Sequence, residues 1–276
     1  MSNFICPVCG KKLNNNTHCL YCENRHSFDL AKSGYVNLLL SQQPKEKRHG
    51  DDRRMVRARS DFLDRGYYAP LLRKLLETVK KYALPGCRIL DAGCGECWYT
   101  SNVFEDLTGC GLKPELFGVD ISKEALAAGA KRNRAIELAV ASVFRLPVED
   151  ASCDIVLSIF APFTGEEFGR VLKDGGVVIR VIPLEKHLLG LKEAVYDHAV
   201  ENKEEPINAE GFELTERQEI RESMVLRRSE DIRNLFMMTP YYYKTGAEDQ
   251  EKLARLSGLE TEIEFGILVY RKKRQV

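Results

Sequence analysis

Short apolar segments alternate with helical patterns through the middle of this 276-residue chain. Apolar residues recur at helical spacing from Pro70 to Val79, with proline at the helix entrance, and Pro85-Gly86 ends that helix. Five short apolar strands are expected, with helices between most of them: strands over 88–91, 116–120, 138–141, 154–159 and 177–182, and helices over 98–107, 123–131 and 166–172. This βαβ alternation predicts a parallel, doubly wound α/β sheet.

The last third of the chain continues with helical patterns and one more strand. Helices are expected near residues 187–200, 230–237 and 250–257, followed by a terminal strand over 262–270. At about 150 residues per domain, the length suggests one large or two unequal domains.

Composition narrows the class of protein. Hydrophobic residues make up 44% of the chain and charged residues 30%, which is ordinary for a soluble globular protein. No apolar run approaches the roughly 18 residues of a membrane span, and the start lacks a basic stretch followed by an apolar segment. We therefore expect a cytoplasmic protein with no membrane partner, whose nine cysteines are metal ligands and small buried hydrophobes rather than disulfides.

A polar, basic segment precedes the predicted sheet. From Ser41 to Ser60 it holds seven Lys or Arg residues against three acids, a net charge of +4. Because the whole chain has zero net formal charge, any nucleic-acid partner would need such a local basic patch. We expect a mobile or ligand-ordered linker whose Arg53, Arg54 and Arg57 contact phosphates.

The first thirty residues have metal-ligand spacing. Cys6-Pro7-Val8-Cys9 places two thiolates on one tight turn, and a second pair further on would complete a tetrahedron around zinc. That second pair is either Cys22 with His26, or Cys19 with Cys22, which forms a second CxxC. A segment this short cannot bury enough apolar surface to fold alone, so zinc would supply most of its folding free energy.

A glycine-rich turn, from Leu90 to Glu96, follows the first predicted strand of the sheet and opens a helix. A dinucleotide site would need a third glycine, and Glu96 would repel a phosphate. Asp91, the acidic residue ahead of the glycines, suits a cationic ligand without phosphate. Asp120, at the end of the second strand, can accept hydrogen bonds from both hydroxyls of a ribose. These features fit S-adenosylmethionine, bound by Asp91, Gly93, Gly95, Glu96, Asp120 and, near the adenine, Ser142.

Several motifs together resemble the zinc-containing 23S rRNA guanine-N1 methyltransferases of the RlmA type. They are the N-terminal Cys and His residues running into His26-Ser27-Phe28-Asp29-Leu30, the turn Asp91-Ala92-Gly93-Cys94-Gly95-Glu96, and the segments Ile159-Phe160-Ala161-Pro162, Arg170-Val171-Leu172-Lys173 and Met238-Thr239-Pro240. The resemblance runs from near residue 5 to near residue 270.

The resemblance implies a class I methyltransferase with a mostly parallel seven-stranded sheet and a small N-terminal zinc ribbon. It divides the chain into a ribbon over 1–37, a basic linker over 38–66 and a methyltransferase domain over 67–276. The implied reaction is methylation of N1 of a guanine in a 23S rRNA hairpin, by a monomer or a homodimer. The zinc ligands it implies are Cys6, Cys9, Cys22 and His26, and its donor-site residues include Tyr68, Gly95, Glu96 and His187.

Two residues depart from the family pattern. Cys97 replaces a frequent glycine, and Phe160 replaces a frequent tyrosine, which removes a hydroxyl near the base. Ala161 cannot offer the amide that amino-methylating enzymes use here, so Phe160 and Pro162 are expected to hold a ring nitrogen of an unpaired base. The base that takes the N1 proton is not identified. A small-molecule methyltransferase and a non-catalytic RNA-binding protein of the same fold remain the alternatives.

Overall fold

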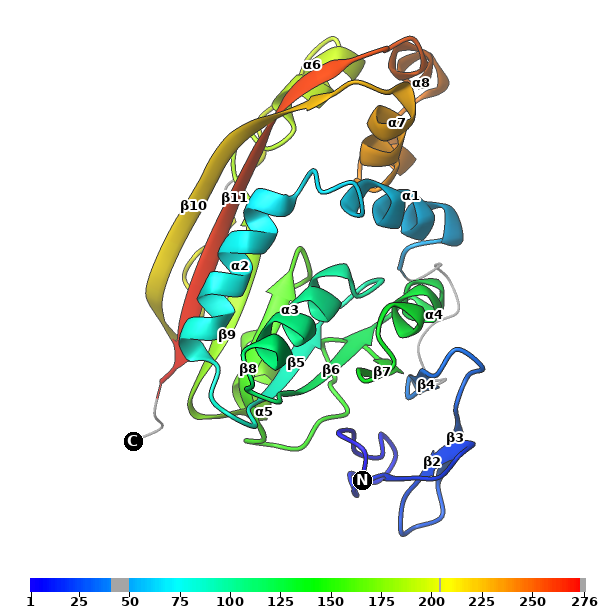
Figure 1. The fold of residues 1–276 in the computed structure, drawn as a ribbon, viewed down its shortest axis with the longest axis vertical. Helices are drawn as coiled ribbons and strands as arrows, with labels where there is room; N and C mark the ends of the chain where they lie inside the picture. Colours follow the sequence, from blue (N-terminus) through cyan, green and yellow to red (C-terminus); the bar gives the residue numbers. More distant parts are fainter. Residues whose placement is uncertain (41–49, 204, 274–276) are drawn as a thin grey trace.

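A twisted sheet of eight strands runs through the molecule, in the order β10-β11-β9-β8-β5-β6-β7-β4 (Figure 1). The computed structural model describes residues 1–40, 50–203 and 205–273. The strands of this sheet are β4 (Val36–Asn37), β5 (Arg88–Ala92), β6 (Glu115–Asp120), β7 (Glu137–Val140), β8 (Cys153–Ile159), β9 (Leu172–Pro183), β10 (Phe212–Leu226) and β11 (Leu259–Lys272).

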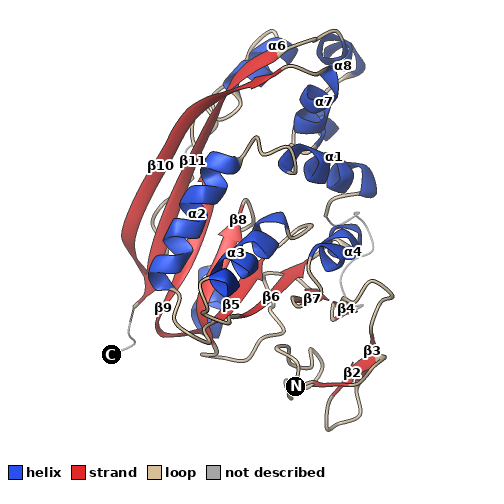
Figure 2. Cartoon of the chain, in the orientation of Figure 1, coloured by secondary structure: helices blue, strands red, loops and turns tan. Residues whose placement is uncertain are grey.

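The centre of the sheet is parallel, as the alternating pattern predicts. Strand β5 pairs in parallel with both β6 and β8, and β7 and β9 extend the parallel part on either side. Helices cover both faces: α2 (Ala69–Tyr82), α3 (Trp98–Gly109), α4 (Lys123–Arg132) and α5 (Gly165–Val171) (Figure 2). Ile89 and Leu90, adjacent in β5, point into two different buried clusters, one with α2, α3 and α4 and the other with α5. The sheet is therefore doubly wound.

Two long antiparallel strands extend one side of the sheet. Strand β11 pairs with β9 and with β10, and β10 lies at the edge. No strand over Phe212–Leu226 was expected from the apolar pattern, because six of its 15 residues are charged and no continuous apolar run marks it. Its inward-facing positions, such as Ile220 and Met224, do alternate with polar ones, as expected of a strand with one solvated face.

The N-terminal ribbon is a small three-stranded sheet docked on the larger one. Its strands are β1 (Asn14–Asn15), β2 (Cys19–Tyr21) and β3 (Ser27–Asp29). The Phe4 ring packs edge-on against Phe117 of β6 at 5.6 Å, and the Ile5 N–H donates to Pro147 O at 2.8 Å. Just beyond the ribbon, β4 pairs in parallel with β7 and adds the eighth strand to the seven that were expected. Ribbon and sheet thus share one buried cluster.

The expectation of a linker over 41–60 was wrong for its second half. Residues 53–63 form helix α1 (Arg53–Leu63), whose N-terminus is capped by the Asp52 carboxylate accepting from Arg54 N and Met55 N. The helix buries Met55, Val56, Ala58, Phe62 and Leu63. Lys45, Lys47 and Arg48, which belong to the same basic run, lie outside the described residues.

The remaining helices lie near the far end of β10 and β11 (Figure 1). They are α6 (Leu189–Val195), shorter than the span expected from the sequence, α7 (Ser229–Met237), the 3₁₀ turn η1 (Tyr242–Lys244) and α8 (Ala247–Ala254). Helix α1 packs against α7, which places α1 above the carboxyl ends of the parallel strands. Within the described ranges, no helix combines the length and apolar character needed to cross a membrane.

Candidate active site and zinc centre

Four side chains of the ribbon converge on one point. The ligand atoms of Cys6, Cys9, Cys22 and His26 all lie within 4.8 Å of one another. The Cys9 and Cys22 sulfurs are 3.7 Å apart, close to the roughly 3.8 Å between two sulfurs bound at about 2.3 Å to a tetrahedral zinc. Cys19 lies in β2 and is not part of the group. The Cys₃His set therefore fits a structural zinc ion, and the four-cysteine alternative is not formed.

A cavity of about 1270 Å³ opens at the carboxyl ends of the parallel strands. This is the edge at which doubly wound sheets bind their ligands. All residues expected to hold the donor line it: Tyr68, Asp91, Gly93, Gly95, Glu96, Asp120, Ser142 and His187. Phe160 and Pro162, expected to hold the base, line the same cavity. Arg53, Arg54 and Arg57 do not; they are exposed on α1.

The turn between β5 and α3 requires glycine at Gly93. Its φ is +93°, and a Cβ there would lie 2.5 Å from the Cβ of Ala161. Ala161 belongs to the turn after β8, so the two turns touch at this point. Cys97, which replaces the family's frequent glycine, adopts a φ of +62°, a left-handed conformation that glycine reaches without strain. The loop thus keeps the glycine-type backbone despite the cysteine.

Asp120 connects the glycine turn to the end of β6. Its Oδ2 accepts from the Gly95 N–H at 2.9 Å, and its Oδ1 accepts from the Ser122 N–H at 2.8 Å. Burial raises the pKa of this carboxyl, while the two N–H groups and Arg59 act in the opposite direction. Each carboxylate oxygen keeps a second lone pair that can accept a ribose hydroxyl.

Two further buried carboxylates have unused acceptor atoms at the cavity. Asp91 Oδ2 accepts from Thr100 Oγ1 at 2.6 Å, while Oδ1 has no hydrogen-bond partner among the described residues. Burial raises the pKa of Asp91 to about 7. Glu96 Oε1 is also buried, and its nearest cation, Arg132, is 3.8 Å away, too far for a hydrogen bond. Buried acceptors in a site without phosphate-binding glycines fit the positively charged methionine end of S-adenosylmethionine.

Arg59 belongs to this site, although its place in the sequence marks it only as one cation of the basic segment from Ser41 to Ser60. It lines the cavity from α1 and forms an ion pair with Asp51. Burial opposes its charge, but Asp51, Glu96 and Asp120 outweigh that effect and raise the pKa of Arg59. The helical spacing of Met55, Arg59 and Leu63, all of which line the cavity, was the signal that could have identified it.

His187 is held as a neutral ring beside Tyr68. Its Nδ1 accepts from the Glu264 N–H at 3.3 Å, which assigns the remaining proton to Nε2, 3.4 Å from the Tyr68 hydroxyl. Burial, aided by the charge of Lys192, lowers the pKa of His187 to about 3. With Nδ1 occupied and Nε2 protonated, His187 shapes the cavity wall and has no free nitrogen for taking a proton.

The two phenylalanines after β8 have different surroundings. Phe160 is 44% exposed, has a φ of +53° and lies at the cavity beside Phe265. Phe163 instead packs against Phe168, Phe212 and Tyr270 and does not line the cavity. Of these two rings, only Phe160 is therefore available to contact a base in the cavity. An ion pair between Arg180 and Glu205, not expected from the sequence, lines the same cavity.

Two family models and a relative from Streptomyces fradiae match this chain. Residues 4–47 match the N-terminal zinc-ribbon model of RlmA, and residues 89–176 match a methyltransferase domain model. The chain is 33% identical over 266 residues to the 23S rRNA (guanine(748)-N(1))-methyltransferase of Streptomyces fradiae, covering 92% of this chain and 91% of the relative. Among solved structures, the YcgJ protein of Bacillus subtilis is 15% identical, with a TM-score of 0.47, and the match covers 74% of this chain and 98% of that one.

The chain belongs to the 23S rRNA guanine-N1 methyltransferase family. It is an S-adenosylmethionine-dependent methyltransferase with a zinc ribbon at its N-terminus. The donor supplies an electrophilic methyl group on a sulfonium. The methyltransferase would hold that donor with the glycine turn, Asp91 and Asp120.

The zinc centre can be tested by substitution, because Cys19 is a cysteine of the same ribbon that lies outside the ligand group and serves as a control. We expect one zinc per chain in the wild type, strongly reduced zinc in Cys22→Ala and His26→Ala, and wild-type zinc in Cys19→Ala, since Cys19 lies outside the ligand group. Elemental analysis measures the metal, and limited proteolysis of the N-terminus measures ribbon folding. Zinc retained by His26→Ala and lost by Cys19→Ala would contradict the assignment.

The donor site predicts a loss of affinity in Asp120→Ala. Charge-assisted hydrogen bonds contribute about 1.5–3 kcal/mol, so S-adenosylmethionine should bind roughly ten- to a hundredfold more weakly. Asp174→Ala is a suitable control, because Asp174 is a 79% exposed aspartate of β9 that lies outside the cavity and pairs only with Lys272, at 3.8 Å, among the described residues. Titration calorimetry measures the affinity and circular dichroism the fold. Unchanged affinity in folded Asp120→Ala would mean that the ribose lies elsewhere.

Proposed function

We propose that this methyltransferase transfers a methyl group from S-adenosylmethionine to N1 of a guanine in a hairpin of 23S rRNA, in the cytoplasm. The Streptomyces fradiae relative carries this activity in its name and matches nearly the whole chain, ribbon included. A small-molecule enzyme would need only the donor-binding region and would have no evident use for the ribbon.

The observation that carries the proposal is the contact between the two turns of the cavity. Gly93 of the donor turn lies against Ala161 of the Phe160–Pro162 turn, closely enough to exclude a Cβ. A donor held by the first turn and a base held by the second would therefore be neighbours in one cavity. Methyl transfer between two bound groups is accelerated mainly by proximity and orientation, which this arrangement supports.

The Arg180–Glu205 ion pair suits the base that is proposed. The Watson–Crick edge of guanine presents two donors, N1–H and the 2-amino group, beside one acceptor, O6. A carboxylate accepts from the former and a guanidinium donates to the latter. Arg180 is buried, and its Nε has no partner in the described part of the chain, whereas the Glu205 side chain is 40% exposed. An adenine, with an unprotonated N1, would offer the carboxylate no ring N–H.

Glu205 is also the residue we assign to the N1 proton. The neutral base carries that proton, which must leave as the methyl group arrives. The other carboxylates lining the cavity belong to the proposed donor side or to the ion pair with Arg59: Asp51, Asp91, Glu96 and Asp120. Glu205 lines the cavity with Arg180, whose strand β9 pairs with β8 just ahead of Phe160. Its carboxylate could therefore receive the proton from a base held at Phe160.

The basic face of α1 is the proposed phosphate contact. Arg53, Arg54 and Arg57 are exposed on the helix that roofs the cavity, and the Arg57 side chain is 84% exposed with Asp61 3.6 Å away. Phosphate contacts from these residues would position the hairpin without reading its sequence. Their role stays a prediction.

The reaction can be tested with purified protein. We expect a 23S rRNA hairpin transcript incubated with S-adenosylmethionine to yield N1-methylguanosine, detected by mass spectrometry after nuclease digestion. Glu205→Gln should lower kcat about a hundredfold, within the range of general-base effects, with little change in the KM for S-adenosylmethionine. Glu213→Gln, an exposed glutamate of β10, is the matched control.

The outcomes separate the parts of the proposal. Transfer to a position other than guanine N1, or to a small molecule instead of RNA, would refute the proposed acceptor. A wild-type kcat in Glu205→Gln would leave the acceptor intact and remove Glu205 from the proton transfer.

A further inference from the structure

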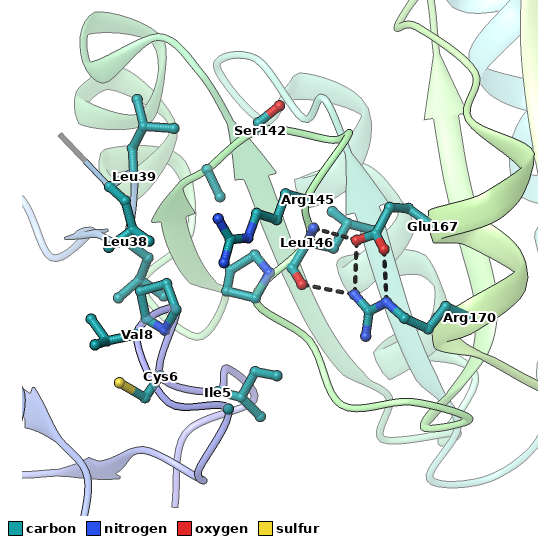
Figure 3. Close-up of a pocket in the computed structure, with 15 residues that line it drawn as sticks. Ile5, Cys6, Val8, Leu38, Leu39, Ser142, Arg145, Leu146, Glu167 and Arg170 are labelled. Carbon is teal, nitrogen blue, oxygen red and sulfur yellow. Dashed lines mark hydrogen bonds and ion pairs between the residues drawn. The ribbon is translucent and has the colours of Figure 1, made fainter. Parts of the chain in front are cut away.

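A second cavity, of about 510 Å³, lies between the zinc ribbon and the sheet (Figure 3). Its size is within the range of about 300–1,000 Å³ typical of ligand sites. Four segments line it: the knuckle from Ile5 to Val8 with Gly10, the leucines 38–40 that follow β4, the loop 141–147 that follows β7, and Glu167 with Arg170 of α5. Only the docking of the ribbon on the sheet creates this space, so neither part has it alone.

Among the described residues that line this cavity, Arg145 is the cation without a counter-charge. The cavity's other arginine, Arg170, is fully engaged: with Glu167 at 2.8 Å, with Asp150 at 2.6 Å and with the Leu146 carbonyl at 2.9 Å. Within the described ranges, the Arg145 side chain makes no hydrogen bond or ion pair. It extends into the space near Leu38 and Leu39 (Figure 3). The lining residues therefore carry one uncompensated positive charge.

The walls around this charge are mainly apolar. Val8, at the tip of the zinc knuckle, is 53% exposed, and Pro7, Leu39 and Pro147 line the cavity beside it. The zinc ligands Cys6 and Cys9 flank Pro7 and Val8, so bound zinc would hold this part of the cavity wall in place. An apolar cavity next to an unpaired guanidinium suits a nucleotide. The flat apolar face of the base would contact the walls, and the negatively charged phosphate would bind the guanidinium.

The cavity adjoins the donor cavity. Ala141 and Ser142 line both, and the turn from Ser142 to Arg145 is closed by the Arg145 N–H donating to Ser142 O at 3.1 Å. A ligand that spans both cavities must therefore pass the Ser142–Arg145 turn. An RNA strand with a base in each cavity meets that condition.

We infer that this cavity binds one unpaired nucleotide of the RNA substrate, close in the hairpin to the methylated guanine, with its base against Val8 and Pro7 and its phosphate on Arg145. This deepens the proposed function and rests on it. The ribbon would then contribute directly to the choice of substrate, because it forms one wall of a base-binding site.

Two variants with matched controls test the site. Arg145→Ala is paired with Arg134→Ala, an exposed arginine after α4 that lines neither cavity. Val8→Ala is paired with Val225→Ala, a similarly exposed valine of β10. Zinc content and S-adenosylmethionine affinity report whether the ribbon and the donor site remain intact. Filter binding of the hairpin over a salt series measures RNA affinity.

We expect Arg145→Ala to weaken hairpin binding about tenfold or more and to lower the log–log salt slope by about 0.7–0.9, the value of one lost phosphate contact. Val8→Ala should weaken binding without changing the slope. Both controls should bind as the wild type does, and all variants should keep their zinc and their donor affinity.

A scan of abasic substitutions in the hairpin identifies the nucleotide. One unpaired position other than the methylated guanine should reduce wild-type affinity, and at that position Val8→Ala should add no further loss, because the base it contacts is already absent. Equal penalties for Val8→Ala on intact and abasic hairpins, or wild-type binding by Arg145→Ala, would overturn the inference. If the wild type methylates no guanine of the hairpin, that result refutes the proposed function, and it does so without any of these variants.

Discussion

The parallel pairing of β8, β5, β6 and β7 is the constraint on which the site depends. Because parallel strands end at the same edge, the glycine turn after β5, Asp120 at the end of β6 and Phe160 after β8 line one cavity there, although 25 residues separate Gly95 from Asp120 and 40 separate Asp120 from Phe160. The hydrogen bond from Gly95 to Asp120 fixes the first two turns together, and the contact of Gly93 with Ala161 fixes the third. The donor and acceptor positions that we propose would thus be set by backbone geometry before any ligand binds.

The zinc ribbon is docked on the face of the sheet that also carries α5. Its four ligands hold the knuckle, while Phe4 packs on Phe117 and Ile5 binds the backbone of Pro147. Metal binding and sheet packing therefore stabilise the same segment. One physical consequence is that the knuckle residue Val8 stands at a fixed position near the Ser142–Arg145 turn, with the second cavity between them.

Local sequence signals identified most of the parallel sheet and the donor cavity. Gly93 and Asp120 follow apolar strands, so their place at the carboxyl edge follows from chain order alone. Strand β10 was not predicted because its solvated face is charged and no apolar run marks it. Helix α1 was predicted as a linker because its polar face is rich in arginine. Arg59 shares helical spacing with Met55 and Leu63, so it would have followed from recognising α1 as a helix. Arg180 and Glu205 come from segments whose packing no local pattern specifies, so only the tertiary structure brings them to the cavity.

The most direct test of the central claim is to map methylation in 23S rRNA from cells with and without the gene. A methyl group on guanine N1 blocks Watson–Crick pairing, so reverse transcription stops at the modified base. The account predicts one stop, at a guanine in a hairpin, that is present with the gene, absent without it and restored by the wild-type protein. Identical maps from the two strains, or a gene-dependent modification at an atom other than guanine N1, would contradict it.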